Sequence, residues 1–161
     1  MKTRVGMDLI LGSILLAVAL VLGLSVDRPA RAATINVSAT LKPKIVLTMP
    51  DSAANFGALD PGVAGSDSVA GNVKANVTWT LTYSATDLSD GTNIVSISNM
   101  TYQGTNIATP QTFSTLGGTI YSAQPPTPNN GFDFTHTYTL TFPWAAVPST
   151  YTGTVTYTAT Q

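Results

Sequence analysis

The chain of 161 residues contains no cysteine, no glutamate, a single histidine and few charged residues of either sign (9%). Without cysteine, the protein has neither disulfide bonds nor a lipid-modified cysteine, so its core and backbone hydrogen bonds must hold the fold. After residue 32 there is no arginine, and three lysines oppose six aspartates, a formal net charge of −3. Neutralising phosphates takes clustered Lys and Arg, which argues against nucleic acid as a partner.

The first 32 residues have the features of a secretory signal peptide, with an expected helical core. Lys2 and Arg4 precede an uncharged run of 16 residues, 9–24, and Ala30-Arg31-Ala32 places small residues at the positions that signal peptidase reads. The run is shorter than the roughly 20 residues that cross a bilayer as a helix. We therefore predict cleavage after Ala32 and a secreted, extracellular protein; the alternative is an uncleaved membrane anchor.

Residues 33–161 are predicted to form a single all-β domain. Nothing in this stretch has the apolar spacing of a helix, and its Thr, Val, Ile and Tyr content favours strands. In residues 77–85, apolar or aromatic residues alternate strictly with Thr and Ser. Such alternation, repeated between turn signals, predicts an antiparallel immunoglobulin-like β-sandwich of about seven to nine strands.

The expected strands are short and separated by Gly, Pro, Asp and Asn. A long connection follows residue 49, in which Phe56 and Leu59 are expected to plug one end of the core, and Asp90-Gly91 is a hairpin signal. The Thr rows of the strands are interpreted as the solvent face of a sheet, although flat Thr arrays can also bind ice or carbohydrate. The expected strands are 34–41, 44–49, 68–73, 77–85, 94–97, 100–103, 119–122, 135–142 and 151–160.

Two tryptophan motifs carry a resemblance to a known family. Trp79-Thr80-Leu81 lies in the middle of the chain, and Tyr138, Trp144 and Pro148 follow in order within "YTLTFPWAAVP". This arrangement resembles the Trp-x-Leu (WxL) surface domains of Gram-positive bacteria. The second motif departs from the family, because Ala146 stands where its leucine is expected.

The WxL resemblance implies non-covalent association with the cell wall, with peptidoglycan or another surface protein as the partner. It implies that Trp79 and Leu81 form a core motif and that Trp144, Tyr138 and Pro148 are candidate contact residues. The alternative is that Trp79 is simply a large core residue and Trp144 an ordinary loop aromatic.

A second resemblance concerns assembly. "FGALDPG" (56–62) and the final "VPSTYTGTVTYTAT" (147–160) are similar to secreted pilin and spore-coat-U-type sandwiches, which lend a strand to a neighbour. Those proteins usually have a cysteine pair that is absent here. The alternating segment 34–41 is the candidate donor strand; the alternative is that it pairs within its own domain.

Catalytic and metal-binding signals are weak, and we expect neither an enzyme nor a cofactor. His136 is on the apolar side of its strand with Tyr138 and Leu140, which favours a structural role. Asp87, Asp90 and Asn93 share one loop and are candidate Ca²⁺ ligands, but the loop lacks the carboxylate density of a calcium loop, and a plain turn is preferred.

The sequence thus predicts an exported, non-catalytic, cell-wall-associated surface protein. The main hypothesis is a WxL-like module that binds peptidoglycan, and the alternative is a filament or coat subunit assembled by strand exchange through residues 34–41. A carbohydrate-binding module is a further alternative, with Trp144 and Tyr121 as its aromatic residues.

Overall fold

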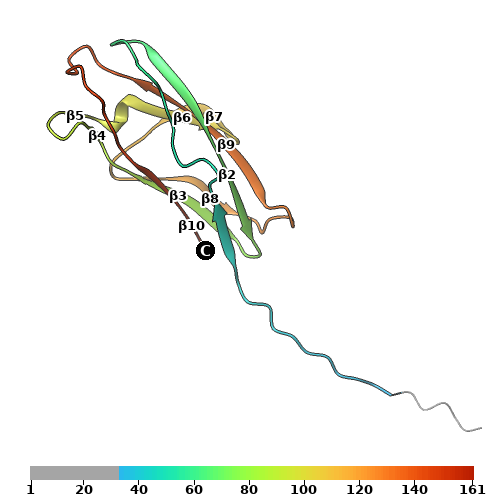
Figure 1. The fold of residues 1–161 in the computed structure, drawn as a ribbon. Coiled ribbons are helices and arrows are strands. Elements are labelled where there is room, and N and C mark those ends of the chain that lie inside the picture. Colours follow the sequence, from blue (N-terminus) through green and yellow to red (C-terminus); the bar gives the residue numbers. More distant parts are fainter. Residues whose placement is uncertain (1–32) are drawn as a thin grey trace, which may run out of the picture. The chain divides into compact units, whose positions relative to one another are not determined.

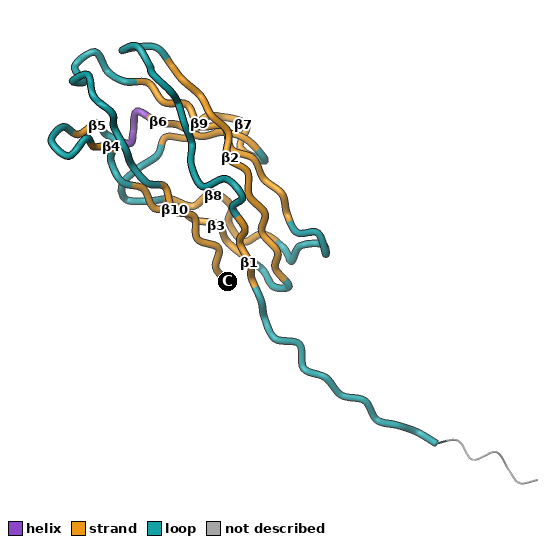
Figure 2. The backbone as a smooth tube through the Cα atoms, viewed as in Figure 1, coloured by secondary structure: helices purple, strands orange, loops and turns teal. Residues whose placement is uncertain are grey.

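The structure is a computed structural model that describes residues 33–161, so the predicted signal peptide lies outside the described residues. The chain divides into two units, one ending at Thr40 and one covering Leu41–Gln161. Residues 33–40, the described part of the first unit, have no regular secondary structure. The second unit is all β (Figures 1 and 2).

Ten strands and one short 3-10 helix, η1 (Ile97–Asn99), make up the regular structure of residues 41–161. All the strand pairs are antiparallel. The strands are β1 (Ile45–Thr48), β2 (Ala64–Ala75), β3 (Trp79–Ala85), β4 (Leu88–Ser89), β5 (Ile94–Val95), β6 (Met100–Gly104), β7 (Ile107–Thr112), β8 (Gly118–Gln124), β9 (Phe132–Thr141) and β10 (Val155–Thr160).

Two sheets of unequal width form the sandwich. The larger has five strands in the order β1-β2-β9-β6-β7, and the smaller has three in the order β10-β3-β8. The pairing of β2 with β9 runs unbroken from Ala64–Thr141 to Val73–Phe132 and forms the backbone of the larger sheet. The predicted all-β antiparallel sandwich is confirmed, and β4 and β5 form the hairpin expected around Asp90-Gly91.

The core lies between the two sheets and is rich in aromatic residues. Trp79 and Leu81 of β3 are buried against Val73 and Phe134 of the larger sheet. Phe113, in the connection from β7 to β8, packs edge-on against Tyr83 with ring centroids 5.0 Å apart. Gly71 in β2 leaves space for Phe134, because a Cβ there would lie 2.3 Å from its ring. Aromatic packing therefore supplies cohesion in a protein without disulfide bonds.

The expected strand at 34–41 is wrong. The segment belongs to no strand, and the exposed fractions of Ile35, Val37 and Leu41 are 85%, 88% and 84%. A strand is stable only when its backbone groups have partners in a ladder, and this segment pairs with no described strand. Regular pairing begins at β1, after Pro43, whose ring nitrogen has no hydrogen to donate.

Strand β7 was not predicted, because Pro110 interrupts its sequence pattern. The structure accommodates this proline because β7 is the outer strand of the five-stranded sheet, where one side of the ladder needs no donors. At the other end of the chain, β10 begins at Val155 and not at Tyr151. Phe56 and Leu59 pack against the core as expected.

A pair of leucine substitutions tests this description of the core. Leu81 is completely buried, so Leu81→Ala is expected to lower the free energy of unfolding by about 2–5 kcal/mol. Leu116 has an exposed fraction of 96%, and Leu116→Ala should change it by less than about 0.5 kcal/mol. Urea denaturation measures both. Equal effects of the two substitutions would contradict the core assignment.

Candidate functional site

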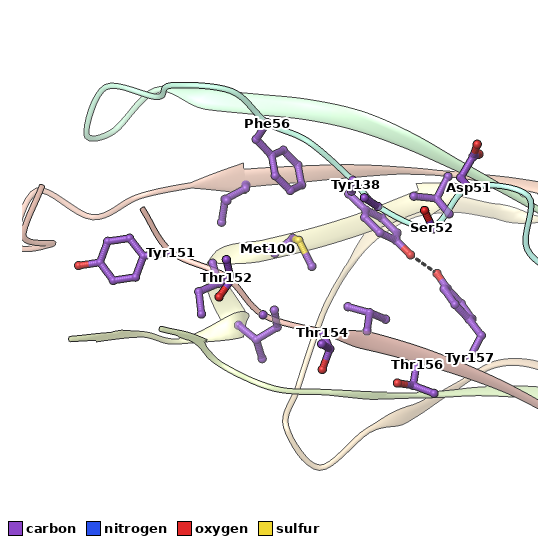
Figure 3. A pocket seen from close by; sticks show the side chains of 18 of the residues that line it. Asp51, Ser52, Phe56, Met100, Tyr138, Tyr151, Thr152, Thr154, Thr156 and Tyr157 are labelled. Carbon is purple, nitrogen blue, oxygen red and sulfur yellow. Dashed lines mark hydrogen bonds between the residues drawn. The ribbon is translucent and has the colours of Figure 1, made fainter. Parts of the chain in front are cut away.

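A groove of about 520 Å³ opens along one side of the sandwich, and we call it the β10 groove (Figure 3). Its walls are residues 49–56, which follow β1, and residues 151–157, which lead into β10. Its size is within the range of ligand pockets, about 300–1,000 Å³. Its apolar lining includes Phe56, Val69, Ile97, Met100, Leu140 and Val155.

The open side of the groove is the free edge of β10. This strand pairs only with β3, and β1 approaches it without pairing. Val155, Tyr157 and Ala159 on its inner face are only half-buried, whereas Tyr83 and Leu81, the β3 partners of Tyr157 and Ala159, are buried. The core is therefore less well covered along β10 than along β3.

The free edge also exposes backbone groups. Thr86 N–H donates to Thr154 O over 3.0 Å, and this bond shows which residues of β10 direct their backbone groups toward β3. Because bonding alternates along an antiparallel pair, Thr156 and Thr158 bond to β3, while Val155 and Tyr157 direct their N–H and C=O groups to the free edge. Among residues 33–161, no backbone bond to these outward groups is present. An incoming strand would find both donors and acceptors there.

The opposite wall of the groove is attached to β2 by side chains. Ala70 N–H donates to Asp51 Oδ2 over 2.8 Å, and Asn55 N–H donates to Asp67 Oδ2 over 2.6 Å. The backbone bonds that Asp67 accepts, from Asn55 and then Ser68, lower the pKa of this carboxyl. A wall held at separate points can move more readily than a strand in a continuous ladder.

Tyr138 and Tyr157, which line the floor of the β10 groove, belong to a chain of hydrogen-bonded rings that links the two sheets. His136 of β9 is completely buried, with Nε2 2.9 Å from Tyr121 Oη of β8 and Nδ1 3.0 Å from Tyr157 Oη of β10. Tyr157 Oη lies 2.5 Å from Tyr138 Oη, and Figure 3 marks the hydrogen bond between the two hydroxyl groups. At the other end, the Tyr121 hydroxyl donates to Thr105 O over 2.6 Å.

These contacts determine the direction of every bond in the chain. Tyr121 uses its only hydrogen on Thr105 O, so its oxygen accepts from His136 Nε2–H. His136 Nδ1 then accepts from the Tyr157 hydroxyl, and Tyr138 donates to Tyr157. A neutral imidazole therefore satisfies every member, and no buried side-chain polar atom of the described residues lacks a partner. If His136 were protonated at Nδ1 as well, Nδ1–H would donate to Tyr157, and Tyr157 would then have to donate to Tyr138.

Burial governs the titration of this chain. Desolvation lowers the pKa of His136 from 6.5 to about 4 and raises that of Tyr121 to about 12. Desolvation is also the largest cause of the raised pKa values of Tyr138 and Tyr157. All four groups are therefore neutral near pH 7, as the bond directions require.

Stability is expected to fall on mild acidification because of His136. Between pH 6.5 and 4 the folded protein binds fewer protons than the unfolded chain, so protonation favours unfolding. The free energy of unfolding should decrease by about 2 kcal/mol from pH 7 to pH 5, above the range where Asp residues titrate. Denaturant titrations at several pH values measure the slope. His136→Gln should be less stable at pH 7 but independent of pH in this window; an unchanged slope would exclude His136 as the cause.

A second apolar groove of about 580 Å³ lies between residues 54–61 and 146–151, beside an exposed tryptophan. Trp144 has an exposed fraction of 82% and lies in a turn closed by Ala146 N–H donating to Pro143 O over 3.0 Å. A Cβ at Gly62 would lie 3.0 Å from Trp144 Nε1, so the indole is close to that glycine. We call residues 143–148 the Trp144 turn.

No protein-family model matches this chain, and no curated protein matches it significantly. Its site must be judged from its own residues.

The proposed WxL contact residues are separated by the structure. Trp144 and Pro148 are exposed in the same turn, whereas Tyr138 is buried at the floor of the β10 groove with its hydroxyl bonded to Tyr157. Tyr138 as a surface contact residue is therefore wrong, because its ring belongs to the core. Trp79 and Leu81 are buried, as the core motif requires, and Trp79 Nε1–H donates to Pro125 O over 3.0 Å.

The Asp87–Asn93 loop is built as a turn. Asp90 accepts bonds from the Asn93 side chain and from the N–H groups of Asn93 and Thr92, which together lower its pKa. Asp87 Oδ1 accepts from Ile97 N–H over 2.8 Å. Within residues 33–161, no three acidic or histidine side chains gather in a way that suits a metal ion. The same residues contain no helix long and apolar enough to span a membrane.

Sequence reasoning missed the groove and the ring chain. The alternation of 151–160 identified the strand, but no local pattern shows that one of its edges stays unpaired. His136 and Tyr138 were assigned to one side of a strand, and the sequence contains no sign that Tyr121 and Tyr157 meet them from the other sheet.

Proposed function

We propose that this protein is an exported, non-catalytic structural subunit of a surface filament or coat, whose copies assemble through residues 34–41. One observation carries the proposal: an alternating segment with exposed Ile35, Val37 and Leu41 occurs in a protein whose folded unit has an unpaired edge beside an apolar groove. In an isolated molecule, the exposed apolar segment and the unpaired strand edge both favour aggregation. When the segment of one copy binds the edge of a neighbouring copy, both are covered.

Strand addition fits the chemistry of the segment. Isoleucine, valine and leucine supply large apolar side chains at odd-numbered positions. The polar residues Asn36, Ser38 and Thr40 occupy the even-numbered positions between them. In an added strand, main-chain hydrogen bonds give affinity and alternate side chains give specificity. Because donor and acceptor are different surfaces, the contact is head-to-tail and generates rings or open filaments.

Two charge substitutions on opposite sides of the segment test this function. In protein comprising residues 33–161, Val37→Asp should weaken self-association at least about 10-fold, because burying a valine contributes about 1.5–3 kcal/mol and a carboxylate cannot replace it. Size-exclusion chromatography with light scattering measures the species present.

The matched control is Ser38→Asp, which adds the same charge at a position facing solvent in an added strand. It should leave the oligomers intact. A monomeric unsubstituted protein at high concentration, or equal effects of the two substitutions, would overturn the proposal.

Association with the cell wall, as a WxL-like module, is a second candidate function. The observation that favours it is the Trp144 turn, which carries an exposed indole and whose residues Ala146, Val147 and Pro148 line an apolar groove. Tryptophan is enriched among the residues that dominate binding energy at interfaces. Peptidoglycan is the expected polymer, and the contact residues reduce to Trp144 and Pro148.

Co-sedimentation with isolated peptidoglycan tests wall binding. Trp144→Ala should reduce the affinity at least about 10-fold, since interface residues of this kind contribute about 2 kcal/mol or more. Leu116→Ala removes an equally exposed apolar side chain from another turn and should have no effect. Failure of the unsubstituted protein to sediment would exclude this function.

A further inference from the structure

We propose that residues 34–41 of a second copy bind along the free edge of β10 and add a fourth strand to the three-stranded sheet. Ile35, Val37 and Leu41 then occupy the β10 groove. This inference rests on the proposed function and names the acceptor surface for it.

The backbone of β10 has unpaired groups along its free edge. Val155 and Tyr157 direct unpaired N–H and C=O groups to the free edge, so an extended segment can complete a ladder there. Free ladder groups on a strand edge are a template for another chain. Residues 34–41 belong to no strand and can supply the missing partners.

The side-chain period of β10 matches that of residues 34–41. Val155 and Tyr157 line the β10 groove and are half-buried, whereas Thr154 and Thr156, at its border, and Thr158 are exposed. A strand added beside them directs alternate side chains into the same groove. If Val37 enters the groove, Ser38 faces solvent and extends the Thr rows of the sheet.

Two other outer strands, β7 and β8, are less suited to accept a strand. The free edge of β7 carries Pro110, and residues 108–112 are all exposed, so an added strand would find no apolar groove there. Along β8 only Tyr121 is buried, and its ring packs edge-on against Phe132 with ring centroids 5.4 Å apart, so aromatic rings fill the core behind this edge. Of these edges, that of β10 combines open backbone groups with an apolar groove.

The wall and the floor of the β10 groove are held in different ways. Residues 49–56 are attached to β2 through Asp51 and Asp67, not through a continuous ladder, so this wall can adjust to an incoming strand. The floor is fixed by the ring chain of His136, which holds Tyr157 in β10 against β9. A rigid floor and an adjustable wall suit the capture of a flexible segment.

Cysteine cross-linking tests this arrangement without background, because the chain has no cysteine of its own. Ser38→Cys protein is mixed with a differently tagged copy carrying Thr154→Cys, Thr156→Cys or Thr158→Cys, and the mixture is oxidised. Disulfides require Cα atoms about 4.4–6.8 Å apart, so one position should give most of the mixed dimer. The position that reacts gives the register.

The matched control is Thr119→Cys in β8, which replaces the same residue type at an exposed position on the opposite edge of the same sheet. It should give at least about 10-fold less mixed dimer. Cross-linking at Thr119 equal to that along β10 would overturn the inference.

A peptide comprising residues 33–42 separates this inference from the proposed function. Added to Val37→Asp protein, it should raise the melting temperature in a concentration-dependent way, and the peptide with Val37→Asp should not. Oligomers that depend on Val37 but neither cross-link along β10 nor respond to the peptide would refute the acceptor and keep the function. Monomers that do not cross-link at any position would refute both.

Discussion

The inner side of a five-stranded sheet has to be covered by a sheet of only three strands, and most of the structure follows from this mismatch. Where β3 and β8 face β2 and β9, the core closes around Trp79 and Phe134. Beyond β10, strand β1 approaches without pairing, and residues 49–56 form the outer wall, so a groove remains. An aromatic core without disulfide bonds must therefore stay stable beside an open edge.

The chain of rings beneath the groove compensates for this opening. A strand with one free edge has half the hydrogen bonds of an inner strand, and Tyr157 gives β10 a further attachment across the core to His136. Since all members are neutral and every hydrogen has an acceptor, the chain adds specificity without burying a charge. The same burial that protects these bonds makes the imidazole a poor base, which suits a structural role.

Much of the fold could be predicted from the sequence, because alternation in 77–85 and 135–142 is a local property that survives in β3 and β9. The segment 34–41 has the same pattern, yet it forms no strand, since pairing depends on a partner that local sequence does not contain. Strand β7 shows the opposite case: Pro110 argues against a strand in the sequence, yet the strand forms because an outer position tolerates a proline. For the candidate site, Trp144 and Pro148 could be found from their motif, whereas the β10 groove arises from strand order, which no single stretch encodes.

The Thr rows of β3 and β10 have a consequence for how quickly copies meet. Thr82 and Thr158 are directly opposite in the register, so hydroxyl groups cover the outer side of the smaller sheet where many proteins place Lys and Glu. Threonine hydroxyls carry no charge, so this side of the sheet neither attracts nor repels an approaching molecule, and dissolved salt has nothing to screen there. Approach along this side is set by diffusion and orientation, for which association rate constants are about 10⁵–10⁶ M⁻¹s⁻¹.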